Sequence, residues 1–285
     1  MDKKKGWNIV KLLLKLLFTS LGLYIVYNNI DLKVISGILR NVVPGYLVAA
    51  IILLVLSQVT GSYRLLGFFK NIKLPVSVKY NLHLYAQGLF YNLFLPGGIG
   101  GDGYKIIALN RKYKEKPKII FGALFFDRLS GLWALGFLCV VMSLFVNIFQ
   151  EYTLYIAVAY LAGTIIYYFV MHRFFPTHTQ RFFSAHALGL LTQSIQVGCA
   201  FFILLALGHH ENFLPYLVIF LLSALSTLFP FTIGGLGARE MAIMYGAATL
   251  GLDKDLSVSL SICFYILSAI VSLSGSVSLF VKEGE

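Results

Sequence analysis

Long apolar runs occupy most of this chain and restrict it to helices packed within a membrane. Six runs are long enough to cross about 30 Å of hydrocarbon as a helix, and they cover roughly residues 8–28, 43–63, 119–147, 152–171, 185–207 and 257–281. Only 12% of the residues are charged, whereas soluble domains carry about 25%. Because backbone exposed to lipid has to satisfy its own hydrogen bonds, the sequence predicts a single all-α domain over residues 1–285, a polytopic membrane helix bundle.

Two further apolar stretches, 81–110 and 213–250, are each interrupted by a glycine-rich motif. The first motif is GGIGGD at 97–102 and the second is GGLGAR at 234–239. Glycine is a poor helix former, and broken backbone at membrane depth has to be buried in protein or line a cavity. Paired interruptions in corresponding positions of two halves are typical of a transporter's binding site.

The charges of the loops predict how the first of these stretches enters the membrane. The flanking segments 64–80 and 105–118 are rich in Lys and Arg, which is typical of cytoplasmic loops. The apolar segment between them therefore enters and leaves on the same side. Its first arm, 81–95, gives only about 22 Å of helix, which is too short to cross. We therefore expect a re-entrant hairpin with its tip at Pro96–Gly103.

The second stretch lies between two segments without a positive excess, 209–211 and 253–255, so we expect a second hairpin that enters from the opposite face. The predicted fold has about six spanning helices plus two re-entrant helical hairpins. Its pseudo-repeats, about 43–147 and 185–281, are expected to be related by an inverted repeat. This arrangement predicts a multi-pass protein of the cell membrane with cytoplasmic N- and C-termini. In the alternative, each hairpin is an ordinary span, which would place the basic loop after the first motif outside.

Five ionisable residues fall at membrane depth: Asp102, Asp127, Arg128, Arg239 and Glu240. Each costs about 2.5–3.5 kcal/mol at the centre of a helix unless it is paired or hydrated. Sequence neighbours point in different directions on a helix, so their partners have to come from elsewhere. We expect a network in which Asp102 and Asp127 face Arg239, while Glu240 faces Arg128. The alternative is a set of structural ion pairs that hold the hairpins in place.

The glycines of the two motifs form the second part of the candidate site: Gly98, Gly100, Gly101, Gly235 and Gly237. A half-helix that begins after a hairpin tip presents free N–H groups and a positive dipole end, which suit an anion such as a lipid phosphate. Asp102 would repel an anion from the first tip, whereas Arg239 favours the second. The alternative role for these glycines is close packing of helices.

Other function classes find little support in the sequence. The basic residues lie in short loops beside apolar spans, so we expect membrane lipid and no nucleic acid as the partner. The three cysteines, Cys139, Cys199 and Cys263, lie inside apolar runs without metal-binding spacing. We expect no metal site and no cofactor, and the sequence contains no ATP-binding loop of the P-loop type.

Three motifs in order, Asn92–Lys105, Phe126–Gly131 and Pro230–Glu240, resemble the lysylphosphatidylglycerol synthase transmembrane-region family, also called flippase-like domain proteins. The resemblance covers nearly the whole chain and implies a polytopic bundle with two re-entrant hairpins. Some members of this family move aminoacylated phosphatidylglycerol between leaflets, and others are linked to glycolipid or polyprenyl-lipid pathways.

By motif position, the resemblance implies Arg128, Arg239 and Glu240 as site residues. The sequence ends after the last apolar helix, so we expect no aminoacyl-transferase domain and no synthesis of lysyl-lipid. We expect a flippase-like transporter, and not an enzyme, that moves an anionic phospholipid, an aminoacylated phospholipid or a polyprenyl-phosphate-linked lipid. The alternatives are an intramembrane enzyme acting on a lipid phosphate or sugar carrier, and a non-transporting partner of a lipid- or glycolipid-biosynthesis enzyme.

Overall fold

The computed structural model describes residues 17, 20, 24–28, 31–94, 100–146, 150–226 and 237–277. Within these ranges every regular element is a helix and there is no strand. The helices are α2 (Leu32–Arg40), α3 (Pro44–Asn71), α4 (Val78–Phe94), α5 (Gly100–Tyr113), α6 (Pro117–Ser143), α7 (Gln150–Phe174), α8 (Pro176–Thr179), α9 (Phe182–Ala206), α10 (Phe213–Leu225), α11 (Ala238–Thr249) and α12 (Lys254–Ser274). The predicted all-α fold is confirmed for the part of the chain that the structure describes.

Five helices are long and apolar enough to cross a membrane: Pro44–Asn71, Pro117–Ser143, Leu154–Phe174, Phe182–Ala206 and Lys254–Ser274. They contain between 21 and 28 residues, and at about 1.5 Å per residue each exceeds the roughly 30 Å of the hydrocarbon core. They correspond to five of the six predicted spans, and the multi-pass membrane fold is confirmed to that extent. The sixth, 8–28, lies mostly outside the described residues.

Several helices begin where the sequence supplies a start signal. Prolines stand in the first turn of α3 and α6, where the missing N–H would have had no partner in the helix. The side chain of Asp253 caps α12 by accepting a hydrogen bond of 3.0 Å from the Leu256 N–H. Asp31 caps α2 in the same way, at 2.8 Å from the Lys33 N–H.

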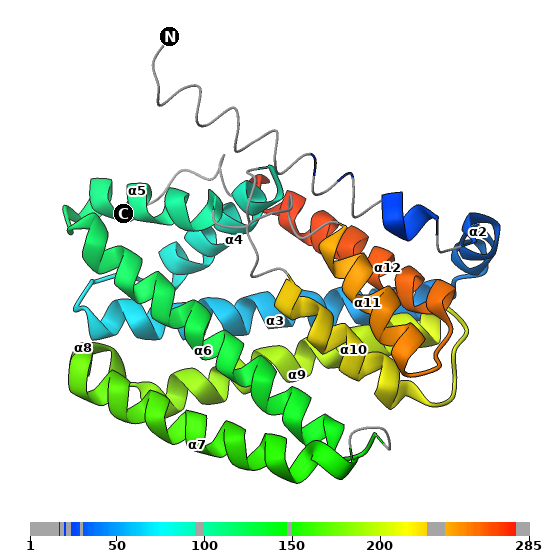
Figure 1. Cartoon of the computed structure of the whole chain (residues 1–285). Helices are drawn as coiled ribbons and strands as arrows, with labels where there is room; N and C mark the ends of the chain where they lie inside the picture. The colour runs from blue at the N-terminus through cyan, green and yellow to red at the C-terminus, as the bar shows by residue number, and fades with distance from the viewer. Residues whose placement is uncertain are drawn as a thin grey trace.

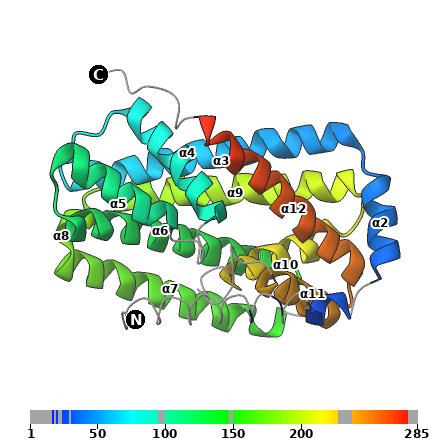
Figure 2. The ribbon, with the colours of Figure 1, turned by 90° about the horizontal axis from the view of Figure 1, so that it is seen from above.

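Helices α3 and α9 run antiparallel, side by side (Figures 1 and 2). The start of α3 meets the end of α9, where the Val43 N–H donates to the Ala206 carbonyl at 2.9 Å. Further along, Thr192 donates to Thr60 at 3.1 Å. Helix α7 lies at the edge of the bundle, and only 6% of its most apolar 18-residue stretch is buried inside the protein. Its exposed apolar side chains indicate a surface that faces lipid.

Helices α4 and α5 pack against each other as an antiparallel pair at one end of the molecule. Tyr80 near the start of α4 contacts Tyr113 at the end of α5, with 6.2 Å between the ring centroids. At the other end of the pair, the Gly101 N–H donates to the Asn92 side chain at 2.8 Å. The outer ends of the pair lie at the same end of the molecule as α8, and the inner ends point toward the middle of the bundle (Figure 1).

Helices α10 and α11 form a second short pair at the opposite end of the molecule (Figure 1). Phe220 of α10 lies beside Arg239 of α11, and Ile219 lies against Gly246. The segment between α4 and α5, 95–99, and most of the segment between α10 and α11, 227–236, lie outside the described residues. Residues 96–99 of the predicted first tip are thus not described, and its last four residues, from Gly100 on, belong to α5.

The same order of elements occurs twice along the chain. A long helix, a short antiparallel pair and a second long helix are found first as α3, α4–α5 and α6, and then as α9, α10–α11 and α12. The first set falls within the predicted repeat of about 43–147, and the second matches the predicted repeat of about 185–281 except that α9 begins earlier, at Phe182. The inverted relation between the repeats stays a prediction.

Two apolar cores lie one after the other along α3. The first surrounds the early part of α3, including Leu54, and joins it to α9, α10 and α12. The second surrounds the late part, from Leu65 to Phe69, and joins it to α5, α6 and the start of α9. Between them α3 carries a polar stretch with Gln58 and the buried Arg64. The polar centre of the molecule therefore lies between two packed apolar regions.

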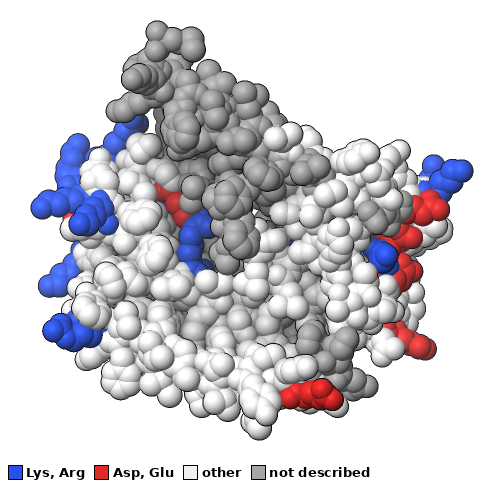
Figure 3. Space-filling model, viewed as in Figure 1, with Lys and Arg blue, Asp and Glu red and all other residues white. Residues whose placement is uncertain are grey.

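Charged side chains gather at the two ends of the bundle (Figure 3). Most basic ones lie at the end formed by α8 and the outer ends of α4 and α5, and most acidic ones lie at the opposite end near α2 and the start of α12. Two basic residues depart from the predicted topology. Arg64 was expected in a cytoplasmic loop, but it lies inside α3, which continues to Asn71, and only 8% of it is exposed. Lys105 was expected in the next cytoplasmic loop, but it lies inside α5 and is 6% exposed.

Candidate functional site

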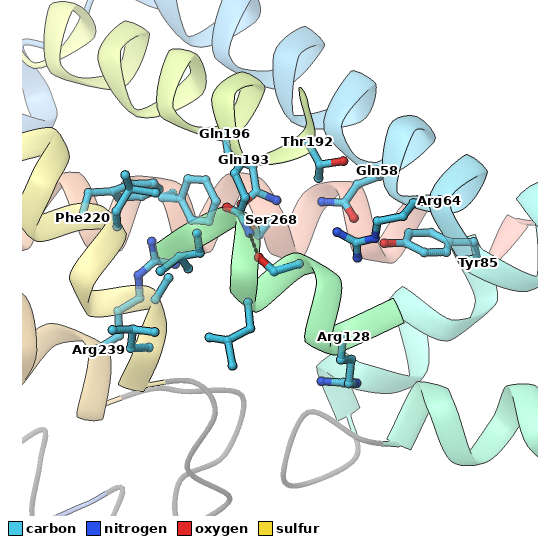
Figure 4. Close-up of a pocket in the computed structure, with 17 residues that line it drawn as sticks. Gln58, Arg64, Tyr85, Arg128, Thr192, Gln193, Gln196, Phe220, Arg239 and Ser268 are labelled. Carbon is cyan, nitrogen blue, oxygen red and sulfur yellow. Dashed lines mark hydrogen bonds between the residues drawn. The ribbon is translucent and has the colours of Figure 1, made fainter. Parts of the chain in front are cut away.

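A cavity of about 320 Å³ lies where the two sets of helices meet (Figure 4). Its volume is within the range of about 300–1,000 Å³ that is typical of ligand sites. Residues from α3, α4, α6, α9, α10, α11 and α12 line it: Gln58, Arg64, Tyr85, Arg128, Gly131, Leu132, Leu135, Thr192, Gln193, Gln196, Phe220, Leu221, Ala224, Leu225, Arg239, Phe264 and Ser268. Three of these side chains are guanidinium groups.

Arg64 and Asp127 form a buried ion pair at one side of the cavity. Arg64 donates from Nε to Oδ1 at 2.8 Å and from Nη2 to Oδ2 at 3.2 Å. The two residues are 8% and 7% exposed. This bidentate geometry is the strong form of an arginine–carboxylate contact, so it holds α3 against α6 and fixes the Arg64 guanidinium at the cavity wall.

Arg128 forms the second ion pair with Asp102, in the first turn of α5. Lys105 also lies 3.3 Å from the same carboxylate. The Arg128 side chain is 45% exposed, whereas that of Asp102 is 14% exposed. Asp102 therefore links α5 to α6 and reduces the net positive charge on this side of the cavity.

Arg239 lies on the opposite side of the cavity from the two pairs (Figure 4). Its guanidinium carbon is 4.7 Å from the centre of the Phe220 ring and 4.5 Å from the centre of the Phe264 ring. Within the described residues it has no acidic partner, and its buried Nε has no hydrogen bond. Aromatic faces stabilise a cation without consuming its N–H donors, so the Arg239 charge stays available to the cavity.

Glu240 makes no ion pair with Arg239 among the described contacts, and it lies in the contact between α11 and α12. Its carboxylate accepts hydrogen bonds from the Gly237 N–H at 2.8 Å and from the Ser261 hydroxyl at 2.9 Å. Gly237 has a φ of +80°, a conformation that favours glycine. Glu240 is therefore a positioning residue for the start of α11, which carries Arg239.

The predicted charge network is wrong in its pairing. Asp127 bonds to Arg64 and Asp102 bonds to Arg128, and neither carboxylate makes an ion pair with Arg239. Glu240 bonds to a backbone N–H and a hydroxyl, not to Arg128. Both acids of the first half are thus used within that half, because α3, α5 and α6 pack together locally.

The structure nevertheless brings Arg128 and Arg239 to one cavity, as the sequence predicts. Sequence reasoning missed Arg64, since it was counted among loop charges. The signal was present, because Arg64 is followed at once by the apolar run Leu65–Phe69 without a turn residue other than Gly67. A charge embedded in a continuing apolar helix is expected to face the interior.

The motif glycines are only partly described. Gly98 and Gly235 lie outside the described residues. Gly101 packs so closely on α4 that an added Cβ would lie 2.0 Å from the Gly88 carbonyl oxygen. At this position the glycine is needed for close helix packing, which was the alternative role for it. A role of Gly100, Gly101 or Gly237 in anion binding stays a prediction.

Uncharged polar side chains separate the arginines. Gln58, Thr192, Gln193, Gln196 and Ser268 line the cavity between the two sides (Figure 4). The Gln193 amide makes one long contact of 3.5 Å to the Gly131 carbonyl. The cavity therefore offers hydrogen-bond donors and acceptors as well as positive charge. Among the described residues, no group of three His, Cys, Asp or Glu side chains could hold a metal ion.

An apolar hollow of about 190 Å³ adjoins this cavity between α3, α4 and α12. The two share Gln58 and Tyr85. Its other walls include Val55, Leu82 and Val271, and Val55 is 43% exposed on the outer surface of α3. An apolar surface thus leads from the outside of the bundle to the polar cavity.

A family model described as "Lysylphosphatidylglycerol synthase TM region" matches residues 12–275. A search of the curated proteins found no match to the chain. The matched region includes every residue named for the cavity and nearly the whole chain.

Proposed function

Because the chain belongs to the lysylphosphatidylglycerol synthase transmembrane-region family, we propose that it is a flippase-like transporter that moves a lipid with a phosphate-bearing headgroup between leaflets. The observation that carries this proposal is the state of Arg239. It lines a cavity in a membrane bundle with no acidic partner among the described residues. An uncompensated cation is costly in a membrane, and such residues usually mark the path of a substrate or an ion.

The headgroup phosphate would bind between Arg239 and the guanidinium groups of Arg64 and Arg128. Guanidinium groups match the oxygens of a phosphate with paired N–H donors. The cavity volume of about 320 Å³ is large enough for a small headgroup but not for acyl chains. The chains would stay in lipid and pass along the apolar hollow beside Val55 and Leu82.

Alternating access would follow from the double order of elements. The pairs α4–α5 and α10–α11 would be re-entrant hairpins that enter the membrane from opposite faces, and the two repeats would be related by an inverted axis. Rocking of one repeat against the other would open the cavity to each leaflet in turn. Because basic residues gather at the α8 end (Figure 3), that end would face the cytoplasm, together with both termini, in the cell membrane.

A reconstitution experiment tests this function. Purified protein is placed in liposomes with labelled phosphatidylglycerol, and a membrane-impermeant quencher measures the label that reaches the outer leaflet. We expect the wild-type protein to exchange label between leaflets. Arg239→Gln should lower the rate by about tenfold or more, since a hydrogen bond to a charged group contributes about 1.5–3 kcal/mol. Arg239→Lys keeps the charge and should retain part of the activity.

Arg173→Gln is the matched control. Arg173 is also an arginine over an aromatic ring, 5.6 Å from the centre of Phe174, but it lies at the end of α7 and outside the cavity. Its substitution should leave the rate unchanged. An Arg239→Gln protein that works at the wild-type rate would contradict the proposed site. Consumption of a lipid without movement of label would indicate an enzyme instead, and neither activity would indicate a non-transporting partner of another enzyme.

A further inference from the structure

The carboxylates nearest the cavity are all occupied by other groups. Asp127 is bonded to Arg64, and Asp102 is bonded to Arg128 and Lys105. Glu240 is bonded to a backbone N–H and a hydroxyl. None of the described residues that line the cavity is an acid. An ammonium group that entered the cavity would therefore meet arginines and no carboxylate free to receive it.

Two stretches outside the described residues, 95–99 (LPGGI) and 227–236 (TLFPFTIGGL), contain neither Asp nor Glu. Around the cavity, the described residues include four cations, Arg64, Lys105, Arg128 and Arg239, and three acids. Arg239 is the cation without an acidic partner among these residues, and its guanidinium lies against the rings of Phe220 and Phe264.

The uncharged polar side chains of the cavity indicate which groups the headgroup carries besides its phosphate. The Gln196 amide faces the cavity (Figure 4) and makes no hydrogen bond to any residue that the structure describes. Thr192 lies nearby on the same helix, and Gln58 and Ser268 line the cavity from α3 and α12. An amide both donates and accepts hydrogen bonds, so this surface suits hydroxyl groups, which also do both.

We propose that this chain selects a lipid whose headgroup is anionic, bears hydroxyl groups and lacks an ammonium group. The inference rests on the proposed function and narrows its substrate. It separates this chain from carriers of a lysyl-lipid, because an aminoacylated headgroup would bring positive charge to a cavity in which Arg239 has no ion pair among the described residues. Uncompensated like charge is a means of rejecting the wrong ligand.

The experiment compares three labelled lipids in the same liposome assay. Phosphatidylglycerol is anionic with hydroxyl groups, phosphatidic acid is anionic without headgroup hydroxyls, and lysylphosphatidylglycerol carries ammonium groups. We expect phosphatidylglycerol to move fastest and phosphatidic acid to move several-fold more slowly. Lysylphosphatidylglycerol should move at least about tenfold more slowly than phosphatidylglycerol, which corresponds to about 1.4 kcal/mol of discrimination.

A charge-adding variant tests the cause of the selection. Gln196→Glu places a carboxylate of nearly the same shape in the cavity, where it can pair with an arginine. It should slow phosphatidylglycerol, and the ratio between the two lipids should shift toward the lysyl form by about tenfold. Gln180→Glu makes the same change at the exposed end of α8 and should leave the ratio as it is. Gel filtration in detergent verifies that both variants are folded.

Two results would overturn the inference. If wild-type protein moves lysylphosphatidylglycerol as fast as phosphatidylglycerol, transport stands and the stated selectivity is wrong. If Gln196→Glu is folded but its preference equals that of Gln180→Glu, the cavity charge does not select the headgroup. Absence of any lipid movement by the wild-type protein would instead refute the proposed function, and the inference with it.

Discussion

The two halves of the molecule treat their cavity arginines differently. In the first half, α3–α6, each arginine has an acid: Arg64 pairs with Asp127, and Arg128 pairs with Asp102. In the second half, α9–α12, Arg239 lies between two phenylalanine rings and has no acidic partner among the described residues. The first half therefore holds its cavity arginines in ion pairs, whereas the second half leaves the Arg239 guanidinium without an ion pair among the described residues.

The two short helix pairs, α4–α5 and α10–α11, also differ in how tightly their helices are held together. The α4–α5 pair makes a close backbone contact, in which Gly101 lies directly on Gly88, and its Asp102 is tied to α6. In the second motif Ala238 stands at the position of Gly101. The glycine of α11 that packs against α10 is Gly246, and an added Cβ there would face the side chain of Ile219. The first pair is thus fastened by backbone packing and ion pairs, and the second by adaptable side chains. This difference favours the second pair as the part that responds to a bound headgroup.

The largest effect is expected from Gly101→Ala. The added Cβ would lie 2.0 Å from the Gly88 carbonyl oxygen, and backbone cannot give way as a flexible side chain can. We expect loss of monodisperse protein on gel filtration, or a large fall of the melting temperature in detergent. Gly246→Ala should be milder, since its Cβ meets a methyl group of Ile219 at 3.0 Å.

Gly103→Ala is the control for this pair of variants. Gly103 lies in the same turn of α5 as Gly101. No heavy atom lies within 4 Å of a Cβ added at Gly103. Because alanine is the better helix former by up to about 1 kcal/mol, it should leave stability equal or slightly higher. Equal melting temperatures for Gly101→Ala and Gly103→Ala would disprove the close contact between α4 and α5.

The next largest effect is expected from Asp127→Asn. It leaves Arg64 without its bidentate partner in a buried place, and removing one member of a buried pair costs about 3–5 kcal/mol. The melting temperature should fall clearly. The double variant Arg64→Gln, Asp127→Asn removes both charges, so it should be less destabilised than the sum of the single changes. Simple additivity of the two single variants would show that the pair is not coupled.

The smallest effect on stability is expected from Asp102→Asn. The side chain of its partner Arg128 is 45% exposed, and exposed pairs contribute only about 0–1 kcal/mol. Its second partner Lys105 is only 8% exposed and also loses its acid, so we expect some destabilisation, but less than for Asp127→Asn. The change removes negative charge beside the cavity, so the first half would come to resemble the second. We expect faster movement of phosphatidylglycerol with a smaller fall of the melting temperature than for Asp127→Asn. A slower rate, or a destabilisation equal to that of Asp127→Asn, would contradict the expectation that the Arg128–Asp102 pair contributes less to stability than the Arg64–Asp127 pair.

Much of the architecture follows from the sequence alone. Runs of apolar residues long enough to span a bilayer predict helices, because no other open structure satisfies its backbone in lipid. The glycine motifs at 97–102 and 234–239 predict two breaks between short helical arms, and the structure has short helices on both sides of each. The sequence also predicts that Arg128 and Arg239 belong to one site. These features depend on local composition, which a single chain displays directly.

The pairing of charges and the position of Arg64 required the tertiary structure. Apolar patterning indicates that a residue lies in a helix, but the partner of a buried charge depends on which helix packs beside it and in which register. Asp127 thus meets Arg64, 63 residues away in the chain, because α3 and α6 pack at that height of the bundle. Sequence alone determined that this protein is a membrane helix bundle with two broken segments. Only packing decided that two of its cavity arginines are matched by acids and that Arg239 is held by aromatic rings.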